Sequence, residues 1–394
     1  MKWLRNLLDQ IAPHFENGGK FEKLGPVFEA TDTILFSTDE RTASGPHIRD
    51  SIDIKRVMIL VVVALLPCYI FGAINIGYQK SLTFGYSSSW LENLLTGAMS
   101  ILPIVAVTFI SGAFWELLFG IVRKHSISEG FLVTCALIPL TLPPSIPLWQ
   151  VAVATSFGIV IGKEIFGGVG MNIFNPALMA RAFLYFTYPV DISGDKVWAL
   201  APDGYSGPTA LSIAAGQTNA DAVDLLNKAS AELAFDFSWM NMFLGWIPGS
   251  IGETNKVVII FSAIFLILIG ITSWRVMFGS VLGLFAMGYL MNLLSPYSSN
   301  AMLSIPPHYH LVMGSFLFGT VFMATEPVTG AHTDLGRWIF GFLVGVLTVI
   351  IRSINPAYPE GIMLAILLMN AFSPLIDYFI VQNNIKKRML RYAQ

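Results

Sequence analysis

Long uninterrupted apolar runs dominate this sequence and limit the structures that it can form. The chain has 394 residues, of which 54% are hydrophobic and 12% are charged, whereas soluble domains average about 25% charged residues. A run of ~20 apolar residues crosses the hydrocarbon core of a bilayer as a helix. Helices satisfy their backbone amides internally, and these runs lack the alternation of a membrane barrel. We therefore expect an all-α integral membrane protein.

About ten apolar segments succeed one another along the chain. Two of them, 130–142 and 311–324, are too short to cross alone and lie next to breaks that contain proline. Such breaks are typical of half-helices that enter a protein-lined interior. The segments are 57–76, 93–119, 130–142, 148–161 and 173–188 in the first half, and 257–271, 276–294, 311–324, 338–351 and 361–380 in the second.

The distribution of basic residues orients these segments. Lys and Arg concentrate on the cytoplasmic side of membrane proteins, and placing both termini in the cytoplasm puts 17 of the 23 Lys and Arg residues there. The interval between the fifth and sixth segments then lies outside. The predicted regions are a cytoplasmic extension (1–56), a first membrane repeat (57–189), an external periplasmic loop (190–255), a second membrane repeat (256–381) and a cytoplasmic basic tail (382–394).

The two membrane halves share a sequence pattern. Trp149 and the pair Ala182–Phe183 recur with the same spacing as Trp338 and the pair Ala371–Phe372, and each tryptophan follows a broken short segment. Five passes in each half make the second copy inverted relative to the first. Inverted repeats place substrate or ion sites at half-helix ends where the copies meet.

Ionisable residues at membrane depth are costly and are functional candidates by default. Glu116, Glu326 and Asp377 all fall near the cytoplasmic side. Their hard oxygen ligands suit Na⁺ or a proton relay, and helix-end charges in contact with water are the alternative. Arg181 lies within the fifth segment, where the alternatives are a structural ion pair and a role beside a flavin or a carboxylate.

Two polar motifs allow either a structural or a functional interpretation. Asn172 and Asn175 precede a proline, as at a capped helix start, yet amide groups also match the hydrogen-bonding edge of an isoalloxazine ring. Residues 203–210 form an ordinary turn by composition or carry a reactive hydroxyl at Thr209.

Other signals are absent from the sequence. Cys68 and Cys135 lie inside apolar runs without metal-ligand spacing. No Walker-type loop and no dinucleotide-binding glycine pattern occurs. We expect no resident metal, no nucleotide-driven pumping and no nucleic-acid partner.

Residues 203–209 resemble the flavin-attachment motif Asp-Gly-x-Ser/Thr-Gly-Ala-Ser/Thr, with Pro208 in place of the alanine. The chain is similar over its whole length to a family of flavin-bearing membrane subunits. This family includes the B subunit of the sodium-translocating NADH:quinone oxidoreductase and the D subunit of the Rnf complex, and the long N-terminal extension favours the branch of the NADH:quinone oxidoreductase. Further segments that carry the resemblance are 114–116, 163–168, 175–178, 247–253 and 355–361.

The resemblance implies two flavins. FMN would be joined to Thr209 through a phosphodiester by a flavin transferase. Noncovalent riboflavin would bind at Asn172 and Asn175, with Arg181 adjacent to a flavin. The other members of the attachment motif that would contact FMN are Asp203, Ser206 and Gly207.

The resemblance also implies quinone and sodium sites. Ubiquinone would bind at Gly112, Ala113 and Phe114, where Ala113 replaces the second residue of a Gly–Gly pair. The acidic positions implicated in sodium handling are Glu29, Glu116, Glu326 and Asp377.

The activity implied is that of one subunit of a Na⁺-transporting NADH:ubiquinone reductase, with no NADH site and no catalytic residue of its own. Partners would include an FMN-bearing subunit outside the cytoplasm and an NADH, FAD and iron–sulfur subunit. The protein would be multi-pass in a bacterial inner (cytoplasmic) membrane. The alternatives are an Rnf-type flavoprotein of the D branch and a non-redox secondary ion transporter of the same architecture.

Overall fold

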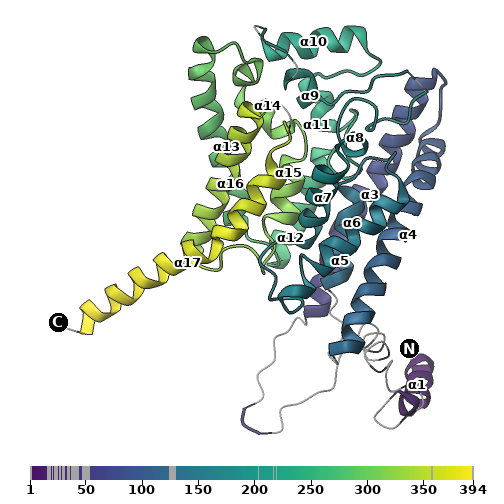
Figure 1. The fold of residues 1–394 in the computed structure, drawn as a ribbon, viewed down its shortest axis with the longest axis vertical. Coiled ribbons are helices and arrows are strands. Elements are labelled where there is room, and N and C mark those ends of the chain that lie inside the picture. Colours follow the sequence, from purple (N-terminus) through teal and green to yellow (C-terminus); the bar gives the residue numbers. More distant parts are fainter. Residues whose placement is uncertain are drawn as a thin grey trace.

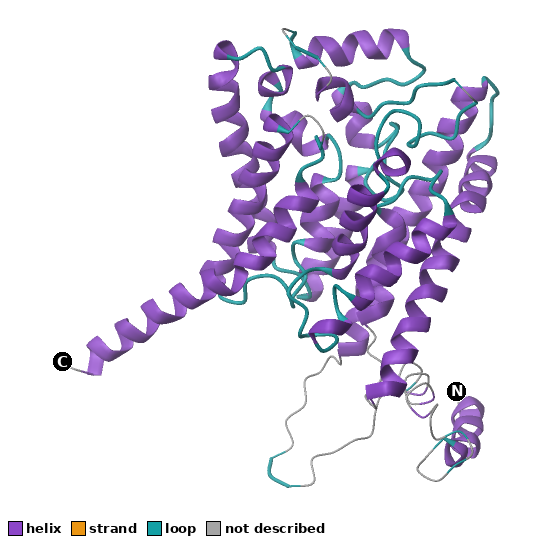
Figure 2. Ribbon diagram, viewed as in Figure 1, coloured by secondary structure: helices purple, strands orange, loops and turns teal. Residues whose placement is uncertain are grey.

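The computed structural model describes residues 2–15, 19, 21, 25, 28, 32, 36, 44–46, 54–123, 130–202, 204–215, 217–218, 220–355 and 358–392. Within these residues the protein is helical, without strands, and has one isolated β-bridge between Thr218 and Asn300. Figure 2 shows helices joined by loops. The all-α prediction is confirmed for the described part of the chain.

The apolar segments form one bundle of helices (Figure 1). The first half contains α3 (Ile54–Phe84), α4 (Trp90–Arg123), α5 (Gly130–Leu140), α6 (Leu148–Val160) and α7 (Pro176–Thr187). The second half contains α12 (Lys256–Ile269), α13 (Trp274–Leu294), α14 (Pro307–Val312), α15 (Phe316–Phe318), the π-helix η6 (Gly319–Met323), α16 (Asp334–Ile354) and α17 (Ile362–Tyr392).

Six helical stretches among the described residues are long and apolar enough to cross a membrane. They are Arg56–Phe84, Trp90–Arg123, Leu148–Phe166, Trp274–Tyr297, Asp334–Ile354 and Ile362–Arg391. The other predicted segments coincide with the shorter helices α5, α7 and α12 and with the run from α14 to η6. The protein is therefore a multi-pass membrane protein.

Helix α3 continues beyond the predicted end at Ile76 because its polar residues find partners. The Asn75 side chain donates to the Ile247 carbonyl at 3.1 Å, and Gln79 donates to Asn75 at 3.1 Å. Apolarity alone ended the predicted segment too early, since satisfied polar groups are tolerated inside a protein.

The two predicted half-helices are broken as expected. Helix α5 ends at Leu140 and is followed by an irregular stretch, 141–147, that contains three prolines. The predicted segment 311–324 is divided where Gly314 adopts a positive φ of 62°, which separates α14 from α15, and α15 continues directly into η6. In η6 the Ala324 amide donates to the Gly319 carbonyl at 2.8 Å, five residues back.

A layer of short helices covers the end of the bundle that lies opposite both termini (Figure 1). It has its own small apolar core, formed around buried Leu211, Leu226, Phe235, Phe237 and Met302. The short helices of this layer are α8 (Pro189–Ile192), α9 (Ala210–Ala215), α10 (Ala222–Glu232), α11 (Trp239–Leu244), η4 (Ser295–Tyr297) and η5 (Ala301–Ser304). At the other end lie α1 (Lys2–Ile11), η1 (Ala12–His14) and η3 (Glu164–Phe166).

Helices α13 and α16 pack closely through glycines spaced four residues apart. A Cβ atom at Gly283 of α13 would lie 2.0 Å from the Phe342 carbonyl oxygen, and one at Gly345 of α16 would lie 2.0 Å from that of Ser280. Small residues at this spacing let helix backbones approach within a membrane. Between the halves, α3 packs on α12 and α7 on α17.

We expect Gly283→Val to lower the Tm of the purified protein in detergent by several degrees. The added side chain meets backbone, which cannot rotate away, and overpacking costs about 1–3 kcal/mol, or roughly 2–4 °C for each kcal/mol. The control is Leu282→Val on the outer surface, where the side chain is 55% exposed. Equal Tm values for the two variants would contradict the close contact.

Candidate functional site

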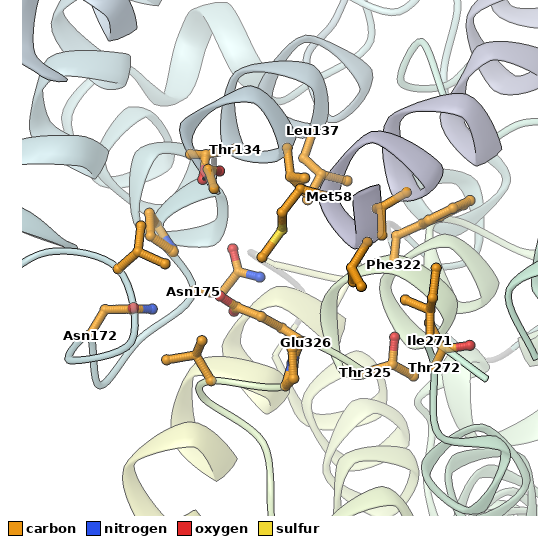
Figure 3. A pocket seen from close by; sticks show the side chains of 18 of the residues that line it. Met58, Thr134, Leu137, Asn172, Asn175, Ile271, Thr272, Phe322, Thr325 and Glu326 are labelled. Carbon is orange, nitrogen blue, oxygen red and sulfur yellow. Dashed lines mark hydrogen bonds between the residues drawn. The ribbon is translucent and has the colours of Figure 1, made fainter. Parts of the chain in front are cut away.

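A pocket near the end of the bundle that carries the termini joins the two halves, and we call it the Asn175 pocket (Figure 3). Its volume is about 90 Å³. The walls are mainly apolar and come from α3, α5 and the loop before α7 on one side, and from the end of α12, η6 and the loop after it on the other. The polar side chains that line it are Thr134, Lys163, Asn172, Asn175, Thr272, Thr325 and Glu326.

Asn175 caps α7, as the structural interpretation predicted. Its side-chain oxygen accepts from the amides of Ala177 and Leu178 at 3.0 and 3.2 Å. The amide nitrogen remains for the pocket, and Figure 3 shows the side chains of Asn175 and Glu326 pointing toward one another. Capping and binding are therefore compatible at this residue.

Glu326 lies in the loop after η6, where the structure brings it together with both asparagines. Burial raises the pKa of its carboxyl to about 7, although hydrogen bonds from Thr329, Asn172 and Asn175 lower it. The Thr329 hydroxyl donates to the carboxyl at 2.8 Å. The sequence assigned Glu326 to the ion and the asparagines to riboflavin, whereas the structure places all three in one pocket.

Glu116 is part of a buried ion pair. Its carboxyl accepts from Lys163, and both side chains are 2% exposed. Lys163 also lies 3.3 Å from Glu164, which Arg123 approaches at 3.4 Å. Mutual pairing allows the charges of Lys163 and Glu164 to be buried.

Asp377 lies apart from this pocket and holds the start of α16. Its carboxyl accepts from the amides of His332 and Thr333 at 2.7 and 3.1 Å and from the Thr333 hydroxyl at 2.5 Å. Thr333 in turn caps the helix by accepting from the Gly336 amide at 3.1 Å. Glu29 lies outside the described residues.

The three predicted quinone residues occupy different faces of α4. Gly112 is buried, and a Cβ there would lie 2.3 Å from the Cys135 sulfur. Phe114 is 57% exposed on the outer surface, and Ala113 is half-buried. The space that glycine provides at 112 is therefore filled by α5.

A second pocket lies on the opposite side of the bundle, and we call it the Thr209 pocket. It encloses about 60 Å³ and is lined by Thr209, by Arg181 of α7 and by residues from the segments 250–255 and 355–361. The Thr209 hydroxyl accepts from the Ser212 amide at 3.2 Å. The structure thus brings Thr209 and Arg181 together.

The motif residues Ser206, Gly207 and Pro208, which precede Thr209, are not among the residues that line this pocket. The Gly207 amide donates to the Asp195 carbonyl at 2.7 Å, and Ser206 is exposed. Pro208 is buried. Asp203 lies outside the described residues.

Sequence reasoning missed Glu253, Tyr358 and Glu360 at this pocket. One carboxyl oxygen of Glu253 and the hydroxyl of Tyr358 are buried without a hydrogen-bond partner among the described residues. Unpartnered buried polar atoms are uncommon and call for an explanation such as a ligand. The signal in the sequence was that the segments 247–253 and 355–361, which contain proline, glycine and one glutamate each, carry the family resemblance.

Fold and pockets define a multi-pass helical membrane protein with a partly polar pocket at each side of the membrane bundle. The profile of the NQR2, RnfD, RnfE family matches residues 41–386, and the chain belongs to this family. It is 47% identical to the B subunit of the Na(+)-translocating NADH-quinone reductase of Pseudomonas paraeruginosa, over 98% of this chain and 99% of that one. Proteins of the same name from Chromohalobacter salexigens and Azotobacter vinelandii are each 48% identical, over 99% and 98% of this chain and 97% and 99% of theirs. These relatives confirm the resemblance seen in the motifs.

The raised pKa of Glu326 predicts a pH dependence of stability. An unfolded Glu ionises near pH 4.5, whereas the folded carboxyl ionises near 7. Folding takes up a proton between these values, so this residue makes stability fall as pH rises across that window and stay level above it. We expect the Tm of wild type to fall relative to that of Glu326→Gln from pH 5 to 7. Parallel Tm curves for the two proteins would contradict the assignment.

Proposed function

We propose that this chain is the membrane subunit of a sodium-pumping NADH:ubiquinone reductase. It carries FMN on Thr209 and riboflavin at the Asn175 pocket, and electrons pass from the first flavin through the second to ubiquinone. The relatives that bear the name of the B subunit match this chain over essentially their whole length. The name of a subunit also supports a multi-subunit complex. The FMN-bearing partner, the NADH-oxidising partner and the flavin transferase that loads Thr209 are those that the resemblance implies.

The observation that carries the proposal is the chemistry of the Thr209 pocket. Thr209 presents a hydroxyl to a pocket that contains a buried guanidinium, an unpartnered carboxyl oxygen and an unpartnered phenol. These groups fit an attached cofactor that has both a charged phosphate and a polar ring edge. When bound, a flavin supplies one- and two-electron redox chemistry, and the residues of this chain position it.

The Asn175 pocket fits a noncovalent flavin in a different way. Its apolar walls match the faces of a planar ring, and the amides of Asn172 and Asn175 match the donors and acceptors of its edge. With both termini in the cytoplasm of a bacterial inner membrane, this pocket is on the cytoplasmic side and the Thr209 pocket on the periplasmic side. Electrons then move inward, from the Thr209 pocket to the Asn175 pocket, within a bundle of ten passes arranged as two inverted repeats.

The sodium path is assigned to the acidic residues Glu29, Glu116, Glu326 and Asp377. Of these, Glu326 is the carboxyl that lies in a flavin pocket. A negative charge that arrives on a ring attracts a nearby cation far more strongly in a low-dielectric interior than in water. Electrostatic coupling between the ring and the ion at Glu326 is the mechanism that this arrangement supports.

Covalent attachment is tested by in-gel fluorescence of the denatured full-length chain, produced in cells that contain the flavin transferase. We expect a fluorescent wild-type band, a dark Thr209→Ala band, and an unchanged band for the matched control Thr218→Ala, an exposed hydroxyl in the same layer. A dark wild-type band would refute attachment and favour the non-redox transporter.

A further inference from the structure

Arg181 carries a buried charge that has no partner in the part of the chain that the structure describes. It lies on α7 and is 7% exposed, and it makes no hydrogen bond or ion pair with any described residue. An unpaired buried charge is strongly destabilising. The guanidinium lines the pocket that Thr209 also lines, so a ligand in that pocket could supply the missing charge.

The other buried cations near this pocket have their partners. Lys256 donates to the carbonyls of Glu253 and Gly314 at 2.6 and 2.9 Å. Arg352 donates to the carbonyls of Glu360 and His310 at 2.9 and 2.6 Å and forms an ion pair with the Glu360 carboxyl at 3.8 Å. Both bases are thus satisfied by backbone oxygens and acidic residues.

The charges of this cluster do not balance. Among the described residues, the Thr209 pocket is lined by the basic side chain of Arg181 and the carboxyls of Glu253 and Glu360, and the basic side chains of Lys256 and Arg352 lie close to these two carboxyls. Counted over the described residues, three basic groups and two carboxyls leave one surplus positive charge, and the basic group without a hydrogen bond or ion pair among them is Arg181. A single negative charge at the pocket would neutralise it.

We propose that Arg181 is the counter-ion of the phosphodiester that attaches the flavin to Thr209. This inference rests on the proposed function. A phosphodiester carries one negative charge, and guanidinium groups bind phosphate oxygens through two parallel hydrogen bonds. Thr209 and Arg181 line the same pocket, so a phosphate on the Thr209 hydroxyl lies beside the guanidinium. The unpartnered Tyr358 hydroxyl is a second donor to the same group.

The test compares full-length protein purified with and without the flavin transferase. Attachment should raise the Tm of wild type by roughly 2 °C or more, because it neutralises a buried charge. In Arg181→Gln this rise should disappear, since no charge is left to neutralise. The control Arg337→Gln removes a half-buried arginine that is already paired with Asp334 and should keep the wild-type rise.

A second measurement covers the case in which Arg181→Gln does not fold. The ³¹P resonance of the attached phosphate should shift between wild type and Arg181→Lys, which keeps the charge but loses the planar fork, and should be unchanged in Arg337→Gln. Identical resonances in wild type and Arg181→Lys, or an equal Tm rise in Arg181→Gln, would overturn the role of Arg181 while leaving attachment intact. A wild-type band without covalent flavin would overturn attachment itself, and the counter-ion role with it.

Discussion

A charge buried in the membrane bundle needs a partner, from the protein or from a bound group, and this requirement organises both pockets. Lys163 pairs with Glu116 beside the Asn175 pocket, and Arg352 pairs with Glu360 beside the Thr209 pocket. Broken helices make such sites possible, because their interrupted ends free carbonyl groups: Lys256 and Arg352 are held by the carbonyls of Gly314 and His310, beside and within α14. The breaks predicted from proline and glycine are therefore the places where buried charge is accommodated.

The two pockets differ in a way that suits different modes of binding. The Asn175 pocket is mainly apolar, with amides and one carboxyl at its edge. The Thr209 pocket is smaller and contains several charged groups. Noncovalent binding relies on burial of apolar surface, whereas a covalent link allows a cofactor to be retained in a small, polar pocket near solvent. Glycine contacts hold α13 against α16 within the second half, and the packing of α3 on α12 and of α7 on α17 joins the two halves that line both pockets.

Length and apolarity are enough to predict the long helices, because a helix satisfies its backbone without help from the rest of the fold. Contacts between side chains from distant segments cannot be predicted from the sequence in the same way. Lys163 resembles a cytoplasmic loop charge until α6 places it beside Glu116, 47 residues earlier in the chain. In the sequence, Gly112 suggests space for a quinone ring beside α4, but in the structure Cys135 of α5 fills that space. Glu253 and Tyr358 become candidates only when the segments before α12 and before α17 meet at Arg181 and Thr209, a contact that no local pattern encodes.

In the proposed function, one chain holds a flavin at each of two pockets on opposite sides of the membrane. A density map of the purified complex at side-chain resolution tests this most directly. We predict continuous density from the Thr209 hydroxyl to a phosphate beside Arg181 and on to a flavin ring, and a separate planar flavin against Asn172, Asn175 and Glu326. A bare Thr209 side chain, or flavin density in only one of the two pockets, would contradict it.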